Sequence, residues 1–145
     1  MPTIHIQNTE IPYDEGNVIA FDEGLIGLPH LRRLVIVTQP EIAPFLWLAS
    51  TETPASAFLV MEPRLLAGAY APEIPAEIRA RIGLRADEDP LLLAIAIISP
   101  EWRHSSINLK APLVIAPGAM RGTQLILSET AYRLDEPLAA LSAAA

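Results

Sequence analysis

Leu91-Leu-Leu-Ala-Ile-Ala-Ile-Ile98 is the stretch of this sequence that decides its fold. It contains no polar side chain, and Asp89-Pro90 and Ser99-Pro100 enclose it. An apolar run of this length between prolines is typical of a strand that is buried on both faces, because a helix so short is marginal and a membrane span needs about 20 apolar residues. We therefore expect residues 91–98 to form the central strand of the core, and a carboxylate placed at Ile95 to be buried there.

A second apolar run, residues 107–115, follows after a polar connection and reads Ile-Asn-Leu-Lys-Ala-Pro-Leu-Val-Ile. Its first half alternates apolar residues with Asn108, Lys110 and Pro112. This period of two is expected for a strand with one face in water. The two runs are therefore predicted to be adjacent antiparallel strands at the centre of one sheet.

Shorter strand-like segments recur along the rest of the chain, with turn residues between them. They cover residues 3–7, 18–21, 34–38, 45–50, 57–61 and 124–127, and residues 130–134 add a short edge. Such a rhythm is typical of antiparallel sandwiches and barrels. The predicted fold class is mainly β: a single compact antiparallel β-barrel, or barrel-like sandwich, with one or two short peripheral helices.

The clearest helix is predicted over residues 75–82. Its proline suits the first helical turn, isoleucines four residues apart line one face, and Gly83 suits the position after a helix end. Glu77 and Arg81 are spaced for a surface ion pair. We assign residues 1–138 to one domain and expect residues 139–145 to be a frayed C-terminal tail, although the alanines of residues 136–145 favour a weak helix.

Composition and charge indicate a globular protein in a reducing environment. About half of the 145 residues are apolar, cysteine is absent, and residues 1–14 lack the basic region and apolar run of a signal peptide. We therefore expect a cytoplasmic protein with no membrane association. The formal net charge of -7 argues against direct nucleic-acid binding, which needs a basic patch. Residues 1–31 hold five carboxylates and no lysine or arginine, which favours either ordinary solubility or attraction of a basic partner.

The side chains that carry catalysis or bind metals do not gather in the sequence. Gly24 and Gly27 resemble part of a phosphate-binding loop, but no G-x-G-x-x-G pattern and no following lysine are present. The three histidines lie far apart, only His104 has a carboxylate close by, at Glu101, and there is no G-x-S-x-G motif. The acidic trio at 87–89 lacks the spaced oxygens and the glycine of a calcium loop. We therefore predict no catalytic residue, no metal ligand and no cofactor.

The two tryptophans differ in their settings. Trp47 lies in an apolar, strand-like segment and is expected in the core, whereas Trp102 lies in the polar stretch 100–104. Two interpretations of Trp102 stay open: its ring covers one end of the barrel, or it contacts a partner.

Four segments stand out by their order and spacing along the chain. They are Phe21-Asp-Glu-Gly-Leu-Ile-Gly-Leu-Pro29, Pro44-Phe-Leu-Trp-Leu-Ala-Ser50, Thr53-Pro-Ala-Ser-Ala-Phe-Leu-Val60 and the run 107–115 already described. Together they resemble the flagellar assembly factor FliW family, over residues 1–138. The resemblance implies a cytoplasmic, non-enzymatic binding protein with a compact, mostly antiparallel barrel.

The same resemblance implies partners. FliW-like proteins bind flagellin and the carbon storage regulator CsrA, a small RNA-binding dimer; binding CsrA relieves translational repression of flagellin, and free flagellin competes for the FliW-like protein. We therefore expect this chain to bind a CsrA-type regulator and flagellin, and to be a monomer when free. It departs from the family pattern at Met61-Glu62-Pro63, where Asp-Pro or Asn-Pro is usual, and at residues 64–71, where Tyr70 is the one aromatic residue.

The contact face is expected on the irregular stretch 62–73, with Glu62, Tyr70 and Glu73 as partner-binding residues. Tyr70 would be an aromatic anchor and the two glutamates an acidic rim, on a loop held by a rigid barrel. The alternative for Tyr70 is that its ring covers the end of the barrel. The alternatives for the whole protein are a small-ligand-binding β-barrel and an unrecognised hydrolase.

Overall fold

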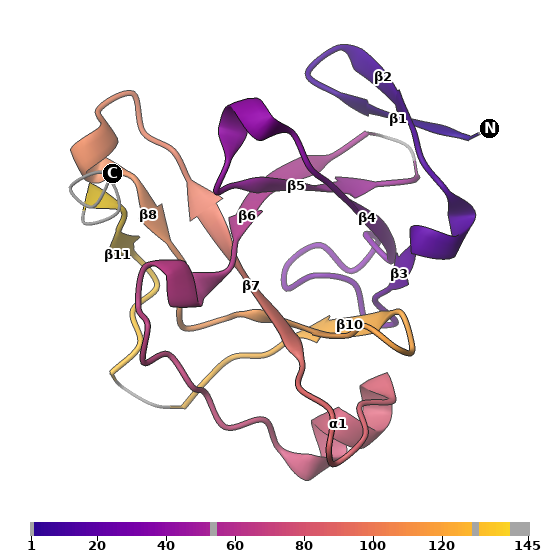
Figure 1. The fold of residues 1–145 in the computed structure, drawn as a ribbon, viewed down its shortest axis with the longest axis vertical. Helices are drawn as coiled ribbons and strands as arrows, with labels where there is room; N and C mark the ends of the chain where they lie inside the picture. The colour runs from indigo at the N-terminus through magenta and orange to yellow at the C-terminus, as the bar shows by residue number, and fades with distance from the viewer. Residues whose placement is uncertain (1, 53–54, 129–130, 140–145) are drawn as a thin grey trace.

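A closed β-barrel is the main feature of the computed structural model, which describes residues 2–52, 55–128 and 131–139 (Figure 1). The barrel strands follow one another in the order β7-β6-β5-β4-β3-β10-β9, and β9 pairs back with β7 to close the ring. Neighbouring barrel strands run antiparallel, except β3 and β10, which are parallel. The predicted fold class, a mainly antiparallel barrel with short peripheral helices, is confirmed.

The elements have the following bounds. The barrel strands are β3 (Ile19–Ala20), β4 (Arg33–Val37), β5 (Leu46–Ser50), β6 (Ala57–Met61), β7 (Leu91–Ile97), β9 (Leu113–Ala116) and β10 (Arg121–Gln124). Outside the ring lie the hairpin β1 (Thr3–Ile6) and β2 (Thr9–Pro12), and the short strands β8 (Ser106–Ile107) and β11 (Glu136–Pro137). The helix is α1 (Ala76–Ile82), and single 3-10 turns are η1 (Glu15–Asn17), η2 (Pro40–Ile42), η3 (Pro63–Leu65) and η4 (Trp102–His104).

Strand β7 closes the barrel, as its apolar sequence predicts. Leu91 pairs with Ile115 and Leu93 with Leu113 in an antiparallel register, so the two apolar runs are neighbours at the centre of the fold. Leu93 is completely buried, and its neighbours Leu92 and Ala94 are buried too. On the other edge of β7, Ala94 pairs with Met61 of β6.

The expectation of burial along the whole run 91–98 is wrong at its second half. Ile95 is only half-buried, and Ile97 and Ile98 are 68% and 43% exposed. The reason is that Ile97 no longer belongs to the ring: it pairs with Ser106 of β8, which extends the sheet past the barrel (Figure 1). A carboxylate at Ile95 would therefore be less costly than one at Leu93.

The run 107–115 forms two strands instead of one. The side-chain oxygen of Asn108 accepts hydrogen bonds from the backbone N–H groups of Lys110 and Ala111, both at 3.0 Å, and this bend separates β8 from β9. Asparagine favours such turns because its side chain bonds to the backbone close by. The alternation in burial persists through the bend, except that Pro112, expected in water, is buried.

Two layers of apolar side chains lie on the two faces of strands β4 and β5. Leu34 and Leu48 point into the barrel with Phe21 and Leu93, and all four are completely buried. On the outer face Trp47 packs with Val35 and with the isoleucines of β1, as Figure 1 shows for the hairpin beside β4 and β5. The interior is thus filled by side chains, which argues against the alternative of a ligand-binding barrel.

Helix α1 ends as its sequence predicts. Pro75 precedes it, and Gly83 follows with φ of 74°, so glycine supplies the left-handed conformation at the C-cap. Ile78 and Ile82 are buried on its inner face. The expected pair between Glu77 and Arg81 is not formed, because Arg81 reaches Glu23 instead, at 3.1 Å.

Three strand predictions need correction. The sequence predicts the first strand of the β1–β2 hairpin but not the second. Gln7 and Asn8 form the tight turn between them, and both have positive φ. The strand expected at 124–127 is displaced to β10, although the N–H groups of Leu125 and Leu127 still bond to the 110–112 segment. In place of an edge at 130–134, residues 136 and 137 form β11. Residues 140–145, most of the expected frayed tail, lie outside the described residues.

Two glycines in the loop after β3 allow a matched test of backbone strain. Gly24 and Gly27 both have positive φ, but a Cβ at Gly24 would lie 2.5 Å from the backbone oxygen of Pro29, whereas one at Gly27 meets nothing within 4 Å. We expect Gly27→Ala to cost about 1 kcal/mol of unfolding free energy from φ alone, and Gly24→Ala about 3 kcal/mol because a backbone clash is added. Urea unfolding of both variants measures the difference, and equal losses would contradict this account of the loop.

Candidate functional site

The irregular segment that follows β6 carries the three residues expected to bind a partner. Strand β6 ends at Met61, and the 3-10 turn η3 begins two residues later at Pro63. The side-chain Nε of Arg64 donates a hydrogen bond of 2.9 Å to the backbone oxygen of Tyr70, which ties the two ends of this segment together. The segment then runs to the start of α1 (Figure 1).

Tyr70 lies in the core and not on the surface. It is 2% exposed, and its hydroxyl donates a hydrogen bond of 2.6 Å to the backbone oxygen of Leu109. Its ring meets that of Tyr132 edge to face, with the ring centroids 4.6 Å apart. A ring so deeply buried is not available as an aromatic anchor at the surface, and its place in the core agrees better with the alternative, that Tyr70 covers the end of the barrel.

Glu62 and Glu73 are exposed, as expected of an acidic rim, but they lie in different hollows. Glu62 lines a cavity of about 170 Å³ with residues of η3 and with Pro90, Leu91 and Leu92. Glu73 lines a hollow of about 140 Å³ with Pro75 and residues 125–128. Neither carboxylate has an ion-pair partner among the described residues. The structure therefore does not join Glu62, Tyr70 and Glu73 into one surface patch.

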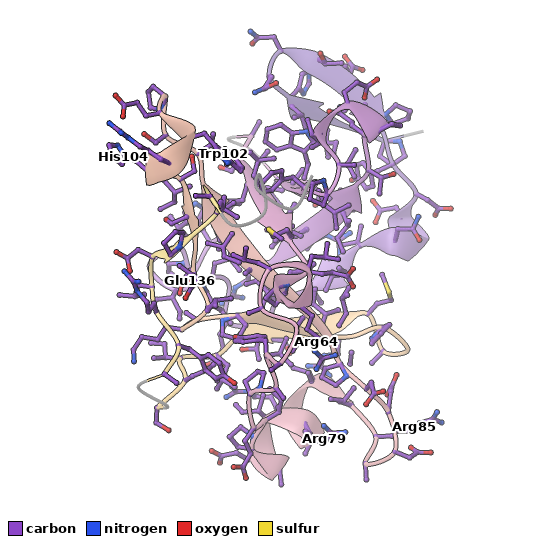
Figure 2. The ribbon with its side chains drawn as sticks, turned by 60° about the vertical axis from the view of Figure 1, so that its left-hand side comes forward. Arg64, Arg79, Arg85, Trp102, His104 and Glu136 are labelled. Carbon is purple, nitrogen blue, oxygen red and sulfur yellow. The ribbon has the colours of Figure 1, made fainter. Side chains whose placement is uncertain are left out.

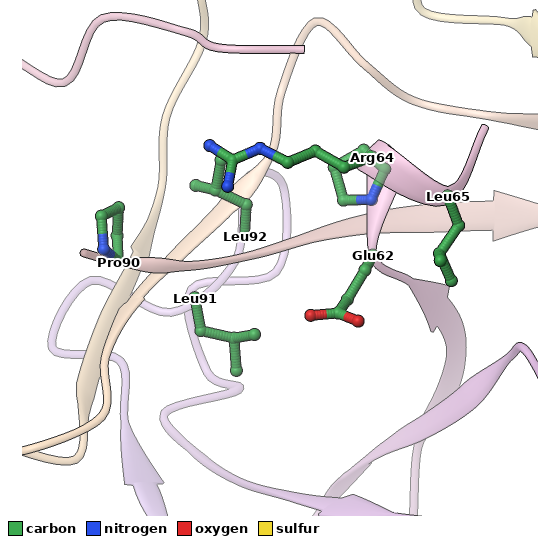
Figure 3. A pocket seen from close by; sticks show the side chains of 7 residues that line it. Glu62, Arg64, Leu65, Pro90, Leu91 and Leu92 are labelled. Atoms are coloured by element: carbon green, nitrogen blue, oxygen red, sulfur yellow. The ribbon is translucent and has the colours of Figure 1, made fainter. Parts of the chain in front are cut away.

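The cavity at Glu62 contains groups that the sequence did not single out. Figure 3 shows the Arg64 guanidinium reaching over Leu92 toward Pro90, and the Glu62 carboxylate turned toward Leu91 on the other side of β7. The exposed side chain of Leu65 adds an apolar wall. A signal for this site existed in the sequence: Pro63 lacks an N–H group, so it cannot continue the ladder from β6 to β7.

The carboxylates of residues 1–31 are largely paired with arginines from later in the chain. Glu15 bonds to Arg33 at 2.7 Å, Glu23 to Arg81 at 3.1 Å, and Asp22 to Arg121. Exposed pairs of this kind contribute little to stability, but they offset the negative charge of the segment. Other exposed carboxylates, such as those of Glu62 and Glu73, have no ion-pair partner among the described residues.

The loop at Trp102 carries charged side chains at the surface beside a half-buried ring. The Trp102 ring is half-buried and meets Phe45 edge to face, with ring centroids 6.3 Å apart, which agrees with a ring that covers the end of the barrel. His104 and Arg103 share the Glu101 carboxylate at the surface. Figure 2 shows His104 at one side of the molecule, far from Arg79 and Arg85. Across the described residues, no three histidine or acidic side chains gather as metal ligands do.

No helix in the described part of the chain is long and apolar enough to cross a membrane.

Comparison with known proteins identifies the family. The chain matches the family described as FliW protein over residues 4–138. It is 32% identical to the flagellar assembly factor FliW of Syntrophotalea carbinolica over 95% of this chain and 98% of that protein. It is 37% identical to that of Symbiobacterium thermophilum over 84% of this chain and 89% of that protein.

A solved structure agrees with these sequence matches. The crystal structure of a flagellar assembly factor FliW superposes with a TM-score of 0.85 at 26% identity, covering 94% of this chain and 96% of that one. The barrel, the segment order and the sequence matches together lead to one conclusion: this chain belongs to the FliW family of flagellar assembly factors.

Proposed function

We propose that this protein is a non-enzymatic, cytoplasmic regulator that binds a CsrA-type RNA-binding protein and flagellin, and thereby relieves repression of flagellin translation. The observation that carries the proposal is membership of the FliW family over nearly the whole chain. The protein acts by occupying another protein, as a monomer when free. It requires no cofactor and makes no direct contact with nucleic acid.

The distribution of charge supports a basic, RNA-binding partner. The net charge is -7, and Glu62 and Glu73 offer exposed carboxylates that no arginine or lysine neutralises among the described residues. Unpaired carboxylates speed the encounter with a basic surface and repel RNA phosphates from the complex. The proposed contact face is the segment 62–73, which ends before α1 begins.

The test is a calorimetric titration of the CsrA-type regulator of the same bacterium with the wild type, Glu62→Lys and Glu73→Lys. Each reversal is expected to weaken binding about two- to fivefold at low salt, because one exposed charge pair contributes about 0.5–1 kcal/mol. The effect should shrink at high salt, where the charges are screened.

Glu77→Lys is the matched control. Glu77 is also exposed and without an ion pair in the described structure, and its substitution changes the net charge by the same amount on α1. Binding by this variant should stay close to wild type. If all three reversals weaken binding equally, overall charge and not this face attracts the partner. If neither protein partner binds at any salt, the proposed function is wrong.

A further inference from the structure

The edge of β1 that faces away from β2 has no neighbouring strand. β1 and β2 form a two-stranded sheet of their own. The Tyr13 N–H donates to the Pro2 oxygen, so Pro2 and, two residues later, Ile4 direct their backbone oxygens toward β2. Thr3 and His5 therefore direct their N–H and C=O groups to the other edge. Both residues are exposed, and among the described residues no hydrogen bond reaches the backbone of either.

The two outer edges of the hairpin differ in how readily they accept another strand. The residues of β2 that face outward are Glu10 and Pro12, by the same alternation. A proline or a charged side chain at the edge of a sheet hinders the addition of a further strand. β1 has no proline from Thr3 to Ile6, so both of its outward N–H groups can donate. Of the two edges, that of β1 is the one suited to strand addition.

A hollow of about 580 Å³ opens beside the free edge of β1. Residues 5–8, the end of β1 and the hairpin turn, line one side of it, residues 55–57 line the other, and Trp47 adds an apolar surface. No described lining residue belongs to β2, and Figure 1 shows β1 between β2 and the connection from β5 to β6. Pockets that bury a ligand have volumes of about 300–1,000 Å³, so this hollow has room for an extended segment.

The surroundings of the hollow favour a segment that carries positive charge. Its described lining holds no lysine, arginine or carboxylate. Glu10 lies opposite His5 on β2, and Glu52 belongs to the same connection as residues 55–57; both are exposed. No arginine or lysine pairs with either carboxylate in the described part of the chain. These two carboxylates attract a basic segment to the hollow.

We propose that an extended segment of the basic, RNA-binding partner adds to β1 at Thr3 and His5 and occupies this hollow. Main-chain hydrogen bonds to these two residues hold the segment, as in strand addition. The residue opposite Ile4 points toward the barrel and is aliphatic, while its two neighbours point outward and include a lysine or arginine. Figure 1 shows the hairpin well away from the segment 62–73, so the hollow is a second contact with the same partner. This inference rests on the proposed function, because it names where the regulator binds.

The first experiment titrates the CsrA-type regulator of the same bacterium with the wild type, His5→Pro and His5→Ala. Proline removes the outward N–H group and places its ring at the edge, so binding should weaken about tenfold or more. Alanine removes the side chain but keeps the N–H group, so His5→Ala should bind as the wild type does. Thermal melting checks that both variants fold; the N–H group that proline removes has no partner among the described residues.

The second experiment does not depend on whether His5→Pro folds. Hydrogen exchange of single amides is measured by NMR in the wild-type protein, alone and with the regulator. The amides of Thr3 and His5 should exchange quickly in the free protein and become protected on binding, whereas those of Ile4 and Ile6 face β2 and should be protected in both states. Docking through side chains alone would not produce this alternation.

The outcomes separate this inference from the proposed function. If the regulator binds without protecting Thr3 and His5, or binds folded His5→Pro as tightly as the wild type, strand addition at β1 is overturned and the function stands. If flagellin protects these amides and the regulator does not, the assignment of the hollow to the basic partner is overturned. If neither protein binds at all, the proposed function fails and this inference fails with it.

Discussion

Replacing Leu93 with aspartate is expected to leave no soluble, folded protein. Leu93 is completely buried inside the barrel and belongs to the strand that closes the ring. The described side chains of the core cluster around Leu93 are apolar, so a carboxylate there either remains charged at a cost of several kcal/mol or takes up a proton with a raised pKa. Either cost is comparable with the total stability of a domain, which is about 5–15 kcal/mol. Yield of soluble protein and circular dichroism of any recovered material provide the measurement.

Ile97→Asp supplies the control on the same strand. Ile97 is chemically similar but 68% exposed, on the part of β7 that extends past the barrel. This variant should be soluble and melt within a few degrees of wild type. If Leu93→Asp behaves like Ile97→Asp, β7 does not close a buried core, and the description of the barrel is wrong.

The second large effect is expected at Tyr70. Tyr70→Ala removes a buried ring that packs against Tyr132 and should lower the free energy of unfolding by about 3–5 kcal/mol. Tyr70→Phe keeps the ring but leaves the Leu109 oxygen without the hydroxyl, which should cost about 1–3 kcal/mol. Urea unfolding followed by tryptophan fluorescence measures both, since Trp47 and Trp102 lie in the fold.

The Tyr70 variants also separate stability from binding. Folded Tyr70→Phe should bind protein partners as the wild type does, because the hydroxyl points into the core. A variant with wild-type stability and weakened binding would instead return Tyr70 to the contact face. An undiminished unfolding free energy in Tyr70→Ala would contradict the buried position itself.

The barrel was largely predictable because its strands follow simple rules. The segment that became β6 was expected at its observed bounds, and the isolation of residues 91–98 between prolines marked the closing strand. The α1 helix followed from Pro75 and Gly83, whose backbone preferences act locally. Features that depend on neighbouring residues in the sequence are the ones that a pattern can reveal.

Features that depend on distant contacts were missed. The polar sequence of β2 gives little sign of a strand, and β2 pairs with β1 in a separate two-stranded sheet. The position of β10 depends on Gly122, where a Cβ would lie 2.9 Å from the Phe21 ring. Hydropathy alone does not show that Ile97 leaves the ring, because an apolar run looks the same inside and beyond a barrel. Strand ends are set by the partner strands as much as by their own residues.

The candidate site was predictable only in part. Glu62 and Glu73 lie at the surface, as a charged residue in an irregular segment usually does. Tyr70 was misplaced because a single aromatic residue among alanines and a glycine does not reveal whether its hydroxyl will meet a buried acceptor such as the Leu109 oxygen. Arg64 bonds to the Tyr70 backbone oxygen because the chain folds back between these two residues, and no local sequence pattern indicates this contact.

A competition experiment tests most directly that this protein acts by occupying other proteins. A labelled CsrA-type regulator from the same bacterium is bound to the wild-type protein, and unlabelled flagellin is then added while fluorescence anisotropy is recorded. We expect saturable binding of the regulator, weakened by salt, and its displacement by flagellin. Absence of a change in anisotropy on mixing the regulator with the folded protein, together with no binding of flagellin, would contradict the account.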